Sequence, residues 1–273
     1  MKFSVITINL NNRSGLEKTI KSVIGQTNKN YELIIIDGGS TDGSYDVILE
    51  NKDHFSYWIS EPDNGIYHAM NKGVMVARGE FCYFLNSGDY IVNSTLFEDL
   101  SKIEITSDIL SGNILKIRAN GKYRTVIPHD NPSLHKLCIH SLPHQASLIR
   151  REIFNEIGMF NETYKIVSDF DFFLRAIIIF RKSYQKVDID FCYFNLDGIS
   201  HNKSFFDLAK NESIACLKIN FPDMAEDLIE YRYFYISNIG QLIRLIQKKK
   251  GLYAFIDQLI GSIFKFKKLL VGR

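Results

Sequence analysis

The stretch Phe81-Cys82-Tyr83-Phe84-Leu85-Asn86-Ser87-Gly88-Asp89 decides the fold of this chain. An apolar run of strand length that ends abruptly in turn residues predicts a buried strand of a parallel sheet. In open α/β sheets, ligands bind just beyond the carboxyl ends of such strands. Gly88 lets the backbone turn tightly, and a carboxylate delivered after it can hold a metal ion against a phosphate. We therefore expect Asp89 to bind a cation, with the upstream strands forming a nucleotide pocket around it.

Three strand and helix pairs precede this stretch. Apolar runs at 3–8, 31–36 and 55–60 predict strands, and each is followed by a polar loop and by apolar residues at helical spacing. This alternation predicts a parallel sheet with right-handed crossovers. Ser14 is the expected N-cap of the first helix.

The loops after the second, third and fourth predicted strands carry Asp37, Asp63 and Asp89. Parallel strands end at the same edge of a sheet, so we expect these three carboxylates to converge. Aspartate and glycine form turns on their own account, which is the simpler explanation of each loop taken alone. Three carboxylates at one edge repel one another, however, unless a cation or a ligand compensates their charge.

The pattern changes after Asp89. More strands are predicted, at 108–118, 122–127, 144–151 and 184–194. Ala119-Asn120-Gly121 between the first two of these indicates a hairpin. Residues 128–142 show little periodicity and predict a loop. Ser168-Asp169-Phe170-Asp171 opens a helix, with Ser168 as the expected N-cap. From Phe205 the chain reads as helical almost to its end, with breaks near Pro222 and Gly251.

The composition is that of an ordinary globular protein. Of the 273 residues, 45% are apolar and 23% charged, enough for one large domain or a domain with an appendage. The four cysteines are widely spaced, which argues against a zinc site or a disulfide framework and fits a reducing cytosol. The N-terminus predicts a strand rather than a signal peptide, and no apolar run reaches the roughly 18 residues of a membrane span. We expect a cytoplasmic protein.

The net charge of +2 is unevenly distributed. Residues 241–273 contain eight basic residues and one acidic residue, so this segment carries +7 and the rest of the chain −5. An apolar stripe between Leu252 and Ile263 is backed by lysines, the pattern of an interfacial amphipathic helix. We predict peripheral contact with the inner face of the cell membrane, although a solvated helix packed on the domain would give the same pattern. No basic, aromatic-interleaved patch on the sheet domain indicates nucleic-acid binding.

The motifs resemble, in order and spacing, those of family 2 glycosyltransferases, most closely the bacterial polysaccharide-biosynthesis branch. The resemblance covers roughly residues 3–203 and rests on six segments at predicted strand ends and helix starts: Ser4-Val5-Ile6-Thr7-Ile8-Asn9, Asp37-Gly38-Gly39-Ser40-Thr41-Asp42-Gly43-Ser44, Ser60-Glu61-Pro62-Asp63-Asn64-Gly65-Ile66-Tyr67, Asn71-Lys72-Gly73, Asn86-Ser87-Gly88-Asp89 and Ser168-Asp169-Phe170-Asp171. It implies the GT-A fold, a Rossmann-like nucleotide-binding mixed sheet flanked by helices, in residues 1–203, with a helical extension over 204–273.

The resemblance also implies a nucleotide-sugar donor, a divalent cation (Mg²⁺ or Mn²⁺) and inversion at the anomeric carbon. By position, the residues expected to bind the donor are Thr7, Asn9, Asp37, Asp63, Lys72, Ser87 and Gly88. Asp89 takes the last position of the family's Asp-x-Asp metal motif, which is Ser87-Gly88-Asp89 here, and His201 lies where some members bring a histidine to the metal. A single carboxylate suffices for Mg²⁺ when phosphates and water complete its shell.

Asp169 takes the place of the catalytic base, with Asp171 as the other candidate. Without the resemblance, Asp169 would be explained by its favourable charge at a helix N-terminus, worth about 0.3–1 kcal/mol. Lys72 could equally be a solvated helix lysine. His144 is open between a hydrogen-bonded structural histidine and a contact with the acceptor or the diphosphate.

The expected function is that of an inverting glycosyltransferase that moves a sugar from a nucleotide-sugar donor, with a UDP-sugar as the first expectation, to a hydroxyl of a lipid-linked glycan of a surface polysaccharide. The cation would neutralise the leaving diphosphate and the base would take the proton of the acceptor hydroxyl. Because one acid of the metal motif is missing, a catalytically idle nucleotide-sugar-binding scaffold is the alternative. A nucleotidyltransferase is disfavoured, since the first loop lacks a glycine-rich, basic triphosphate cradle.

Overall fold

The structure is a computed structural model that describes residues 1–117, 121–195, 203–247 and 258. The chain divides into two compact units, Met1–Asn220 and Phe221–Arg273. The motifs quoted above all fall in the first unit. The division of the chain into a transferase domain of residues 1–203 and an extension of residues 204–273 stays a prediction.

The first unit is built on a mixed sheet of nine strands among the described residues, in the order β3-β2-β1-β4-β8-β6-β9-β5, with β7 paired to β6. The strands are β1 (Phe3–Asn9), β2 (Tyr31–Asp37), β3 (Tyr57–Ser60), β4 (Phe81–Phe84), β5 (Tyr90–Ile91), β6 (Ile109–Ile117), β7 (Tyr123–Val126), β8 (Ser147–Arg150) and β9 (Tyr184–Asn195). β1 pairs in parallel with β2 and β4, and β2 with β3. The predicted parallel half is therefore confirmed. β8 runs antiparallel to both β4 and β6, so the second half of the sheet is mixed.

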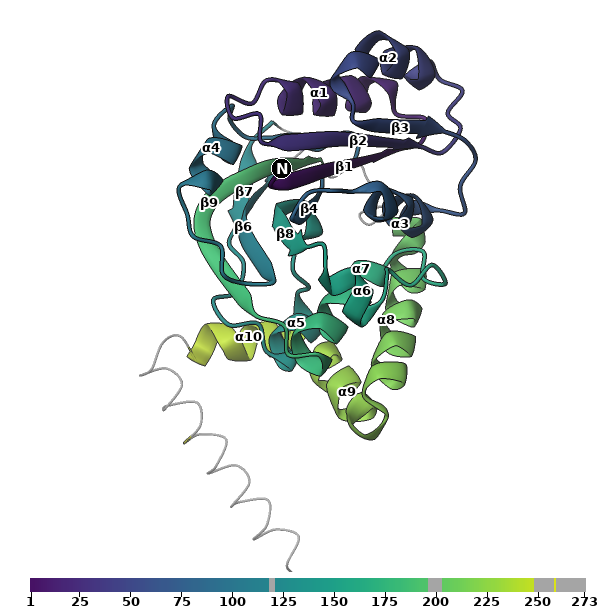
Figure 1. The fold of residues 1–273 in the computed structure, drawn as a ribbon. Helices are drawn as coiled ribbons and strands as arrows, with labels where there is room; N and C mark the ends of the chain where they lie inside the picture. Colours follow the sequence, from purple (N-terminus) through teal and green to yellow (C-terminus); the bar gives the residue numbers. More distant parts are fainter. Residues whose placement is uncertain (118–120, 196–202, 248–257, 259–273) are drawn as a thin grey trace, which may run out of the picture. The chain divides into compact units, whose positions relative to one another are not determined.

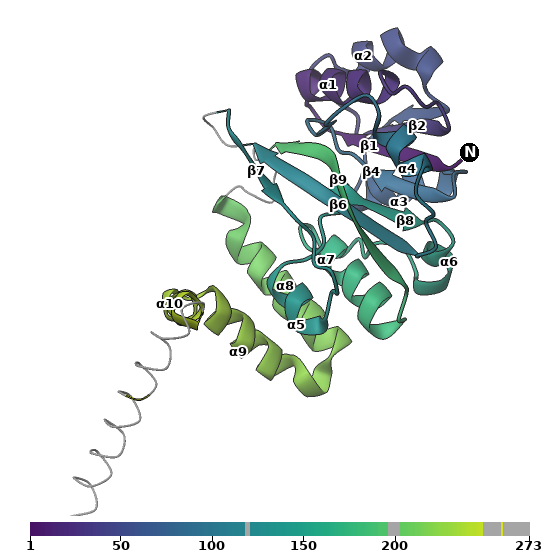
Figure 2. The same ribbon diagram turned by 90° about the vertical axis from the view of Figure 1, so that its left-hand side faces the viewer.

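Helices cover both faces of the parallel half. α1 and α2 lie on one face, and α3 lies on the other (Figure 1). In Figure 2, β6 and β9 run side by side through the mixed half, in agreement with their parallel pairing. The helices of this unit are α1 (Arg13–Ile24), α2 (Ser44–Asn51), α3 (Ile66–Val76), α4 (Leu96–Ser101), α5 (Leu134–Ile139), α6 (Ile153–Ile157), α7 (Ser168–Phe173), which continues into a π-helical turn (Leu174–Ile179), and α8 (Phe206–Asn220), with short 3₁₀ turns at Lys52–His54, His144–Ala146 and Lys203–Phe205.

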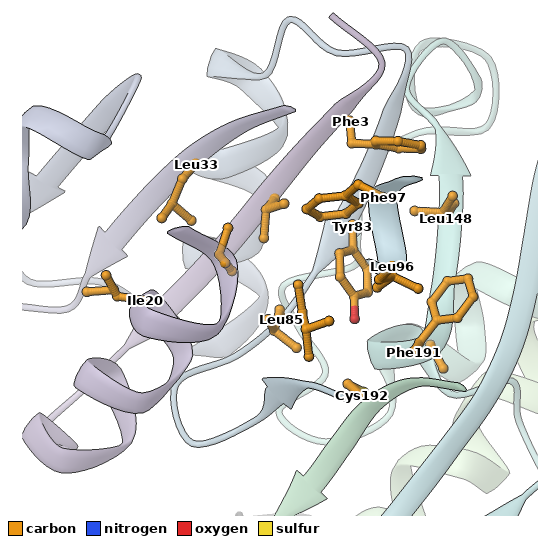
Figure 3. Packing of buried hydrophobic residues seen from close by; sticks show 14 of the residues in the cluster. Phe3, Ile20, Leu33, Tyr83, Leu85, Leu96, Phe97, Leu148, Phe191 and Cys192 are labelled. Atoms are coloured by element: carbon orange, nitrogen blue, oxygen red, sulfur yellow. The ribbon is translucent and has the colours of Figure 1, made fainter. Parts of the chain in front are cut away.

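Alternation along the strands explains why the sheet has two cores. In β1, β2 and β4 the odd-numbered apolar residues, such as Phe3, Leu33 and Tyr83, pack under α1, α2 and α4. Figure 3 shows Tyr83 between Phe97 and Phe191, with its hydroxyl pointing toward Cys192. The even-numbered residues face the opposite way. There a set of stacked and edge-on rings joins the strands to α6 and α7: Phe84, Phe154, Phe160 and Phe172.

Three local predictions were wrong. Residues 128–142 contain α5, whose six residues are too few to show a helical period. The N-cap of α1 is Asn12, which accepts from the N–H of Gly15, rather than Ser14. Ser168 is the first residue of α7 instead of its cap. The predicted hairpin strands are present as β6 and β7, but residues 118–120 of their turn lie outside the described residues.

The described part of the second unit is helical, as expected. It contains a 3₁₀ turn (Pro222–Met224), α9 (Ala225–Ile236) and α10 (Asn238–Gln247). The break at Pro222 is confirmed, and the one near Gly251 lies outside the described residues. Three apolar side chains of α10 are exposed: Ile239, Leu242 and Leu245. Among the residues that the structure describes, none of the helices is both long and apolar enough to cross a membrane.

Candidate active site

The loops that follow the parallel strands meet at one edge of the sheet, as predicted. Asn9 is in register with Asp37, and Asp37 with Ser60. The backbone pairing continues past the strand ends, because the N–H of Gly38 donates to Asn9 and that of Ser87 to Ile8. The residues predicted to bind a donor therefore start from one continuous edge.

Asp37 is the most fully bonded carboxylate at this edge. Its Oδ1 accepts from Asn9 Nδ2 at 2.7 Å and from Ser40 Oγ at 2.6 Å. Its Oδ2 accepts from the Ser40 N–H at 2.9 Å and from Ser60 Oγ at 2.6 Å. Burial alone would raise the pKa of Asp37, but the hydrogen bonds from Ser40, Ser60 and Asn9 lower it below its ordinary value. Asp37 is thus an ionised carboxylate that ties the first three loops together.

Other polar oxygens at the same edge lack partners. Thr7 Oγ1 and Asn9 Oδ1 are buried and accept or donate no hydrogen bond among the described residues. The Asp63 carboxylate lies directly beside Gly38. A Cβ added to Gly38 would lie only 2.6 Å from Oδ2 of Asp63. Glycine at position 38 therefore allows the loops after β2 and β3 to touch. Lys72 on α3 pairs with Glu61 at 2.6 Å, which places its ammonium group beside the loop after β3.

The loop after β4 turns sharply at Gly88, whose φ of +102° lies in the region that favours glycine. The Gly88 N–H donates to Thr19 Oγ1 at 3.0 Å, and the Thr19 hydroxyl lies 2.6 Å from the carbonyl of Asp89. Asn12 Nδ2 donates to the Ser87 carbonyl at 3.0 Å. Asn12, the N-cap of α1, and Thr19, in the middle of α1, therefore hold the backbone of this turn in place.

Asp89 itself is only 5% exposed. Its Oδ1 accepts from the N–H of Asn195 at 3.0 Å. Burial raises the pKa of the neighbouring Tyr83 and Cys192, and the charge of Asp89 raises both pKa values further. Burial raises the pKa of Asp89 to about 8, and the Asn195 hydrogen bond offsets only part of that effect. The carboxylate lies at the inner end of the turn, against the core.

A divalent cation such as Mg²⁺ is bound by carboxylate, carbonyl, phosphate and water oxygens. No lysine or arginine among the described residues lowers the pKa of Asp89, so its ionised form lacks a compensating positive charge there. The same residues include no group of three histidine, cysteine, aspartate or glutamate side chains that could hold a metal by themselves. A divalent cation at this edge would therefore have to take one protein carboxylate, that of Asp89, and most of its other ligands from a diphosphate and water. His201, the second predicted metal ligand, lies outside the described residues.

Asp169, the predicted base, lies in the first turn of α7 with a side chain that is 21% exposed. Its Oδ2 is 3.1 Å from Nδ1 of His144. Its Oδ1 accepts from the N–H of Phe170 at 2.9 Å and lies 3.3 Å from the hydroxyl of Tyr67. The carboxylate is thus held from α3, from the 3₁₀ turn before β8 and from α7 itself.

Asp171, the other candidate base, is placed differently. It is buried and forms an ion pair with Arg175 Nε at 2.8 Å, and Asn220 Nδ2 donates to it at 2.9 Å. Arg175 also donates to two carbonyls of the 157–159 segment. Asp171 therefore connects α7 to α8, whereas the carboxylate with access to solvent is that of Asp169.

Four site residues had no role in the sequence-based prediction or only an open one: Asn86, Tyr67, His144 and Glu212. Glu212 of α8 accepts from the N–H groups of Lys165, Ile166 and Val167, just before α7. Tyr67 donates to the carbonyl of Ile166 at 2.7 Å. Asn86 carried a positional signal, because it follows a predicted strand. Tyr67 belonged to one of the quoted motifs but had no assigned role, and Glu212 carried no signal, since the partners of both residues lie far away in the sequence.

Comparisons with known proteins identify the family. The model of the family described as "Glycosyl transferase family 2" matches residues 4–173. The uncharacterized glycosyltransferase MT1564 of Mycobacterium tuberculosis (strain CDC 1551 / Oshkosh) is 35% identical over 183 residues, which cover 64% of this chain and 69% of the relative. A PGL/p-HBAD biosynthesis glycosyltransferase of Mycobacterium bovis (strain BCG / Pasteur 1173P2) is 29% identical over 180 residues, with the same coverage of both chains.

Solved structures show the same fold. S. aureus TarS 1–349 in complex with UDP-GlcNAc matches with a TM-score of 0.66 at 19% identity, covering 93% of this chain and 78% of TarS 1–349. The mannosyltransferase PcManGT from Pyrobaculum calidifontis, in complex with GDP-Man and Mn²⁺, matches with a TM-score of 0.63 at 13% identity, covering 96% and 80% of the two chains. The GT-A fold expected from the motifs is confirmed. With a family model that matches residues 4–173, more than half of its length, the chain belongs to glycosyl transferase family 2.

Proposed function

We propose that the chain transfers a sugar, with inversion at the anomeric carbon, from a nucleotide-sugar donor to a hydroxyl of a lipid-linked saccharide. The coarser activity, glycosyl transfer, follows from the family. One observation carries the finer proposal: a part-exposed carboxylate, Asp169, is connected through His144 to the loop after β4. That loop follows the strand end where a donor diphosphate would lie.

The donor would bind at the edge formed by the loops after β1, β2 and β3. Buried polar atoms in proteins are nearly always hydrogen-bonded, so Thr7 Oγ1 and Asn9 Oδ1 without partners indicate a polar ligand. Both could contact a base or a ribose, with Asp63 beside them. A uridine diphosphate donor is the first choice, since TarS has been solved with UDP and with UDP-GlcNAc. GDP-mannose, bound by PcManGT, is the alternative.

The reaction needs a base on the face of the sugar opposite the leaving diphosphate. In our proposal the Asp169 carboxylate takes the proton of the acceptor hydroxyl, and the oxygen attacks the anomeric carbon as the bond to the diphosphate breaks. A positioned base of this kind contributes about 10²–10⁴-fold to the rate. A divalent cation, held by Asp89 and the diphosphate, would neutralise the charge that develops on the leaving group. Ser87 and Gly88 would shape the turn around the phosphates.

The proposed acceptor is a lipid-linked glycan of a surface polysaccharide, such as O-antigen, capsule or exopolysaccharide, met at the cytoplasmic face of the cell membrane. The exposed apolar residues of α10 and the basic residues that follow it in the sequence support this placement. Such a segment can lie in the headgroup region of an anionic leaflet.

A thermal-shift screen tests the donor. Binding to the native state raises stability by RT ln(1 + [L]/Kd), so the true donor should raise the melting temperature most among UDP- and GDP-sugars. The screen is run with and without Mg²⁺ or Mn²⁺. If Asp89 holds the cation, Asp89→Asn should lose the metal-dependent part of the shift while retaining the metal-independent part.

Transfer assays with the selected donor test the base. Asp169→Asn should bind the donor as wild type does and transfer sugar about 10²–10⁴-fold more slowly. The matched control is Asp53→Asn, at an exposed position away from the edge. If wild type and the Asp89 and Asp169 variants are equally inert with every donor while UDP still binds, the scaffold alternative replaces the enzyme.

A further inference from the structure

His144 occupies a position between the two halves of the proposed reaction. It is the first residue of the 3₁₀ turn before β8, and its side chain is 10% exposed. Nδ1 lies 3.1 Å from Oδ2 of Asp169, and Nε2 lies 3.4 Å from Nδ2 of Asn86. The imidazole therefore bridges the start of α7 and the loop after β4, two segments that are far apart in the sequence.

The partners of the ring determine which nitrogen carries the proton. The carboxylate of Asp169 can only accept, so Nδ1 of His144 carries a hydrogen and donates it to Oδ2. In a neutral His144 the other nitrogen, Nε2, is then an acceptor for the amide nitrogen of Asn86. Asn86 Oδ1 is buried and has no hydrogen-bond partner among the described residues. Rotation of this amide would turn Oδ1 toward Nε2–H, so Asn86 can accompany His144 in its neutral and in its protonated form.

The contacts of Asp169 leave Oδ2 better able than Oδ1 to accept a proton. A carboxylate has about four lone-pair positions. Oδ1 accepts from the Phe170 N–H and adjoins the Tyr67 hydroxyl, whereas Oδ2 has His144 alone among the described residues. Burial, and secondly the charge of Asp169, raise the pKa of Tyr67 well above its ordinary value, so its hydroxyl stays protonated. The Tyr67 hydroxyl donates its hydrogen to Ile166 and lies 3.3 Å from Oδ1, where it restricts access to that oxygen, so the accessible lone pair is on Oδ2, beside the imidazole.

We propose that His144 is a positioning residue for the base: it holds Asp169 through Oδ2 and directs the second lone pair of that oxygen to the acceptor. This inference rests on the proposed function. In the transfer step the acceptor O–H bond breaks and an O–H bond forms on Oδ2. The electron pair left on the acceptor oxygen bonds to the anomeric carbon, and the diphosphate leaves with the electrons of its own bond. His144 keeps its Nδ1 hydrogen throughout.

A nitrogen NMR experiment on the full chain without substrate tests the contact. Free neutral histidine favours the Nε2–H tautomer, so an Nδ1–H tautomer for His144 would show that Asp169 accepts from it. The wild-type spectrum should show Nδ1–H, and Asp169→Ala should shift His144 toward Nε2–H. The His144→Asn spectrum assigns the resonance by its disappearance. An Nε2–H tautomer in wild type, or an Nδ1–H tautomer that persists in Asp169→Ala, overturns the proposal.

Kinetics test the positioning. His144→Leu keeps much of the volume but removes the donor, whereas His144→Asn places an amide N–H near the position of Nδ1. With the donor selected by the thermal-shift screen, or with UDP-GlcNAc and GDP-Man as probes, His144→Leu should lower kcat about 10- to 100-fold. The Kd for UDP should be unchanged, and His144→Asn should recover most of the loss.

Each outcome is distinguishable. A change in KM or in UDP binding with kcat intact assigns His144 to the donor and overturns the positioning role, as does an equal loss in the leucine and asparagine variants. If His144→Leu fails to fold, the asparagine variant and the tautomer still decide. A wild-type protein inactive with every donor refutes the proposed function and with it the catalytic role. The tautomer of His144 then reports the Asp169 contact independently.

Discussion

Replacing Asp37 by asparagine tests how the sheet edge is held together. The carboxylate accepts four hydrogen bonds, two on each oxygen. In Asp37→Asn one of these oxygens becomes an NH₂ group. An NH₂ group in the place of Oδ1 faces the amide nitrogen of Asn9. An NH₂ group in the place of Oδ2 faces the backbone N–H of Ser40. In both orientations two donors oppose each other, and the hydroxyl of Ser40 or Ser60 must turn away.

The magnitude follows from the number of bonds lost. Hydrogen bonds to a charged group contribute about 1.5–3 kcal/mol each, and two are lost in either orientation. We expect Asp37→Asn to lower the free energy of unfolding at pH 7 by about 3–6 kcal/mol. Ser60→Ala removes a single donor and should cost about 1.5–3 kcal/mol. The exposed Asp53→Asn serves as the control and should change stability by less than about 0.5 kcal/mol.

The difference in stability between wild type and Asp37→Asn should depend on pH. The pKa of Asp37 is lowered in the folded protein, so its carboxylate contributes stability above the unfolded pKa of about 3.9. This contribution is lost as the pH falls through the lower folded value. Urea unfolding followed by circular dichroism should therefore give a constant gap between wild type and Asp37→Asn from pH 5 to pH 8, and a narrowing gap below about pH 4. A variant as stable as wild type at pH 7, or a gap that widens on acidification, would refute this reasoning.

Two further predictions concern other parts of the chain. Deleting residues 241–273 should release the protein from anionic vesicles in a flotation assay, because each basic residue contributes about 1 kcal/mol at such a surface; unchanged flotation would rule out a membrane role for this segment. Gly73→Ala should destabilise the protein by about 1–3 kcal/mol in urea unfolding, since the new Cβ would lie 2.3 Å from Cγ2 of Ile6. A gain in stability, as expected for alanine in an open helix, would contradict the close packing of α3 on β1.

The parallel half of the fold could be predicted because each strand ends in a polar loop of recognisable composition. The alternation of strands and helices alone predicted that the loops carrying Asp37, Asp63 and Asp89 start from one edge of the sheet, and the strand pairing confirms this for the loops. The mixed half follows from pairings such as β4 with β8, which join segments of distant sequence and have no local pattern. Short elements were missed for a related reason: α5 has too few residues for a period.

The site was predictable where residue type and strand end coincide. Asp169 needed the family motif, because an aspartate at a helix start also has a simpler electrostatic explanation. The motif already favoured Asp169 over Asp171, and the structure adds a physical reason, because Arg175 pairs with Asp171. His144 could not be assigned to either of its two roles, since its partners lie in distant segments.

The hydrogen bonds between Glu212 and the segment before α7 have a consequence for how members of the family can diverge. Glu212 lies on α8, outside residues 4–173 that match the family model. Its carboxylate nevertheless receives three backbone N–H groups immediately before Asp169. A recombinant chimera that joins this sheet to the C-terminal helices of another member would inherit the proposed base, Asp169, from one parent and its support from the other. If Asp169 acts as we propose, exchange of these helices would change the rate of transfer without altering a residue that contacts the sugar.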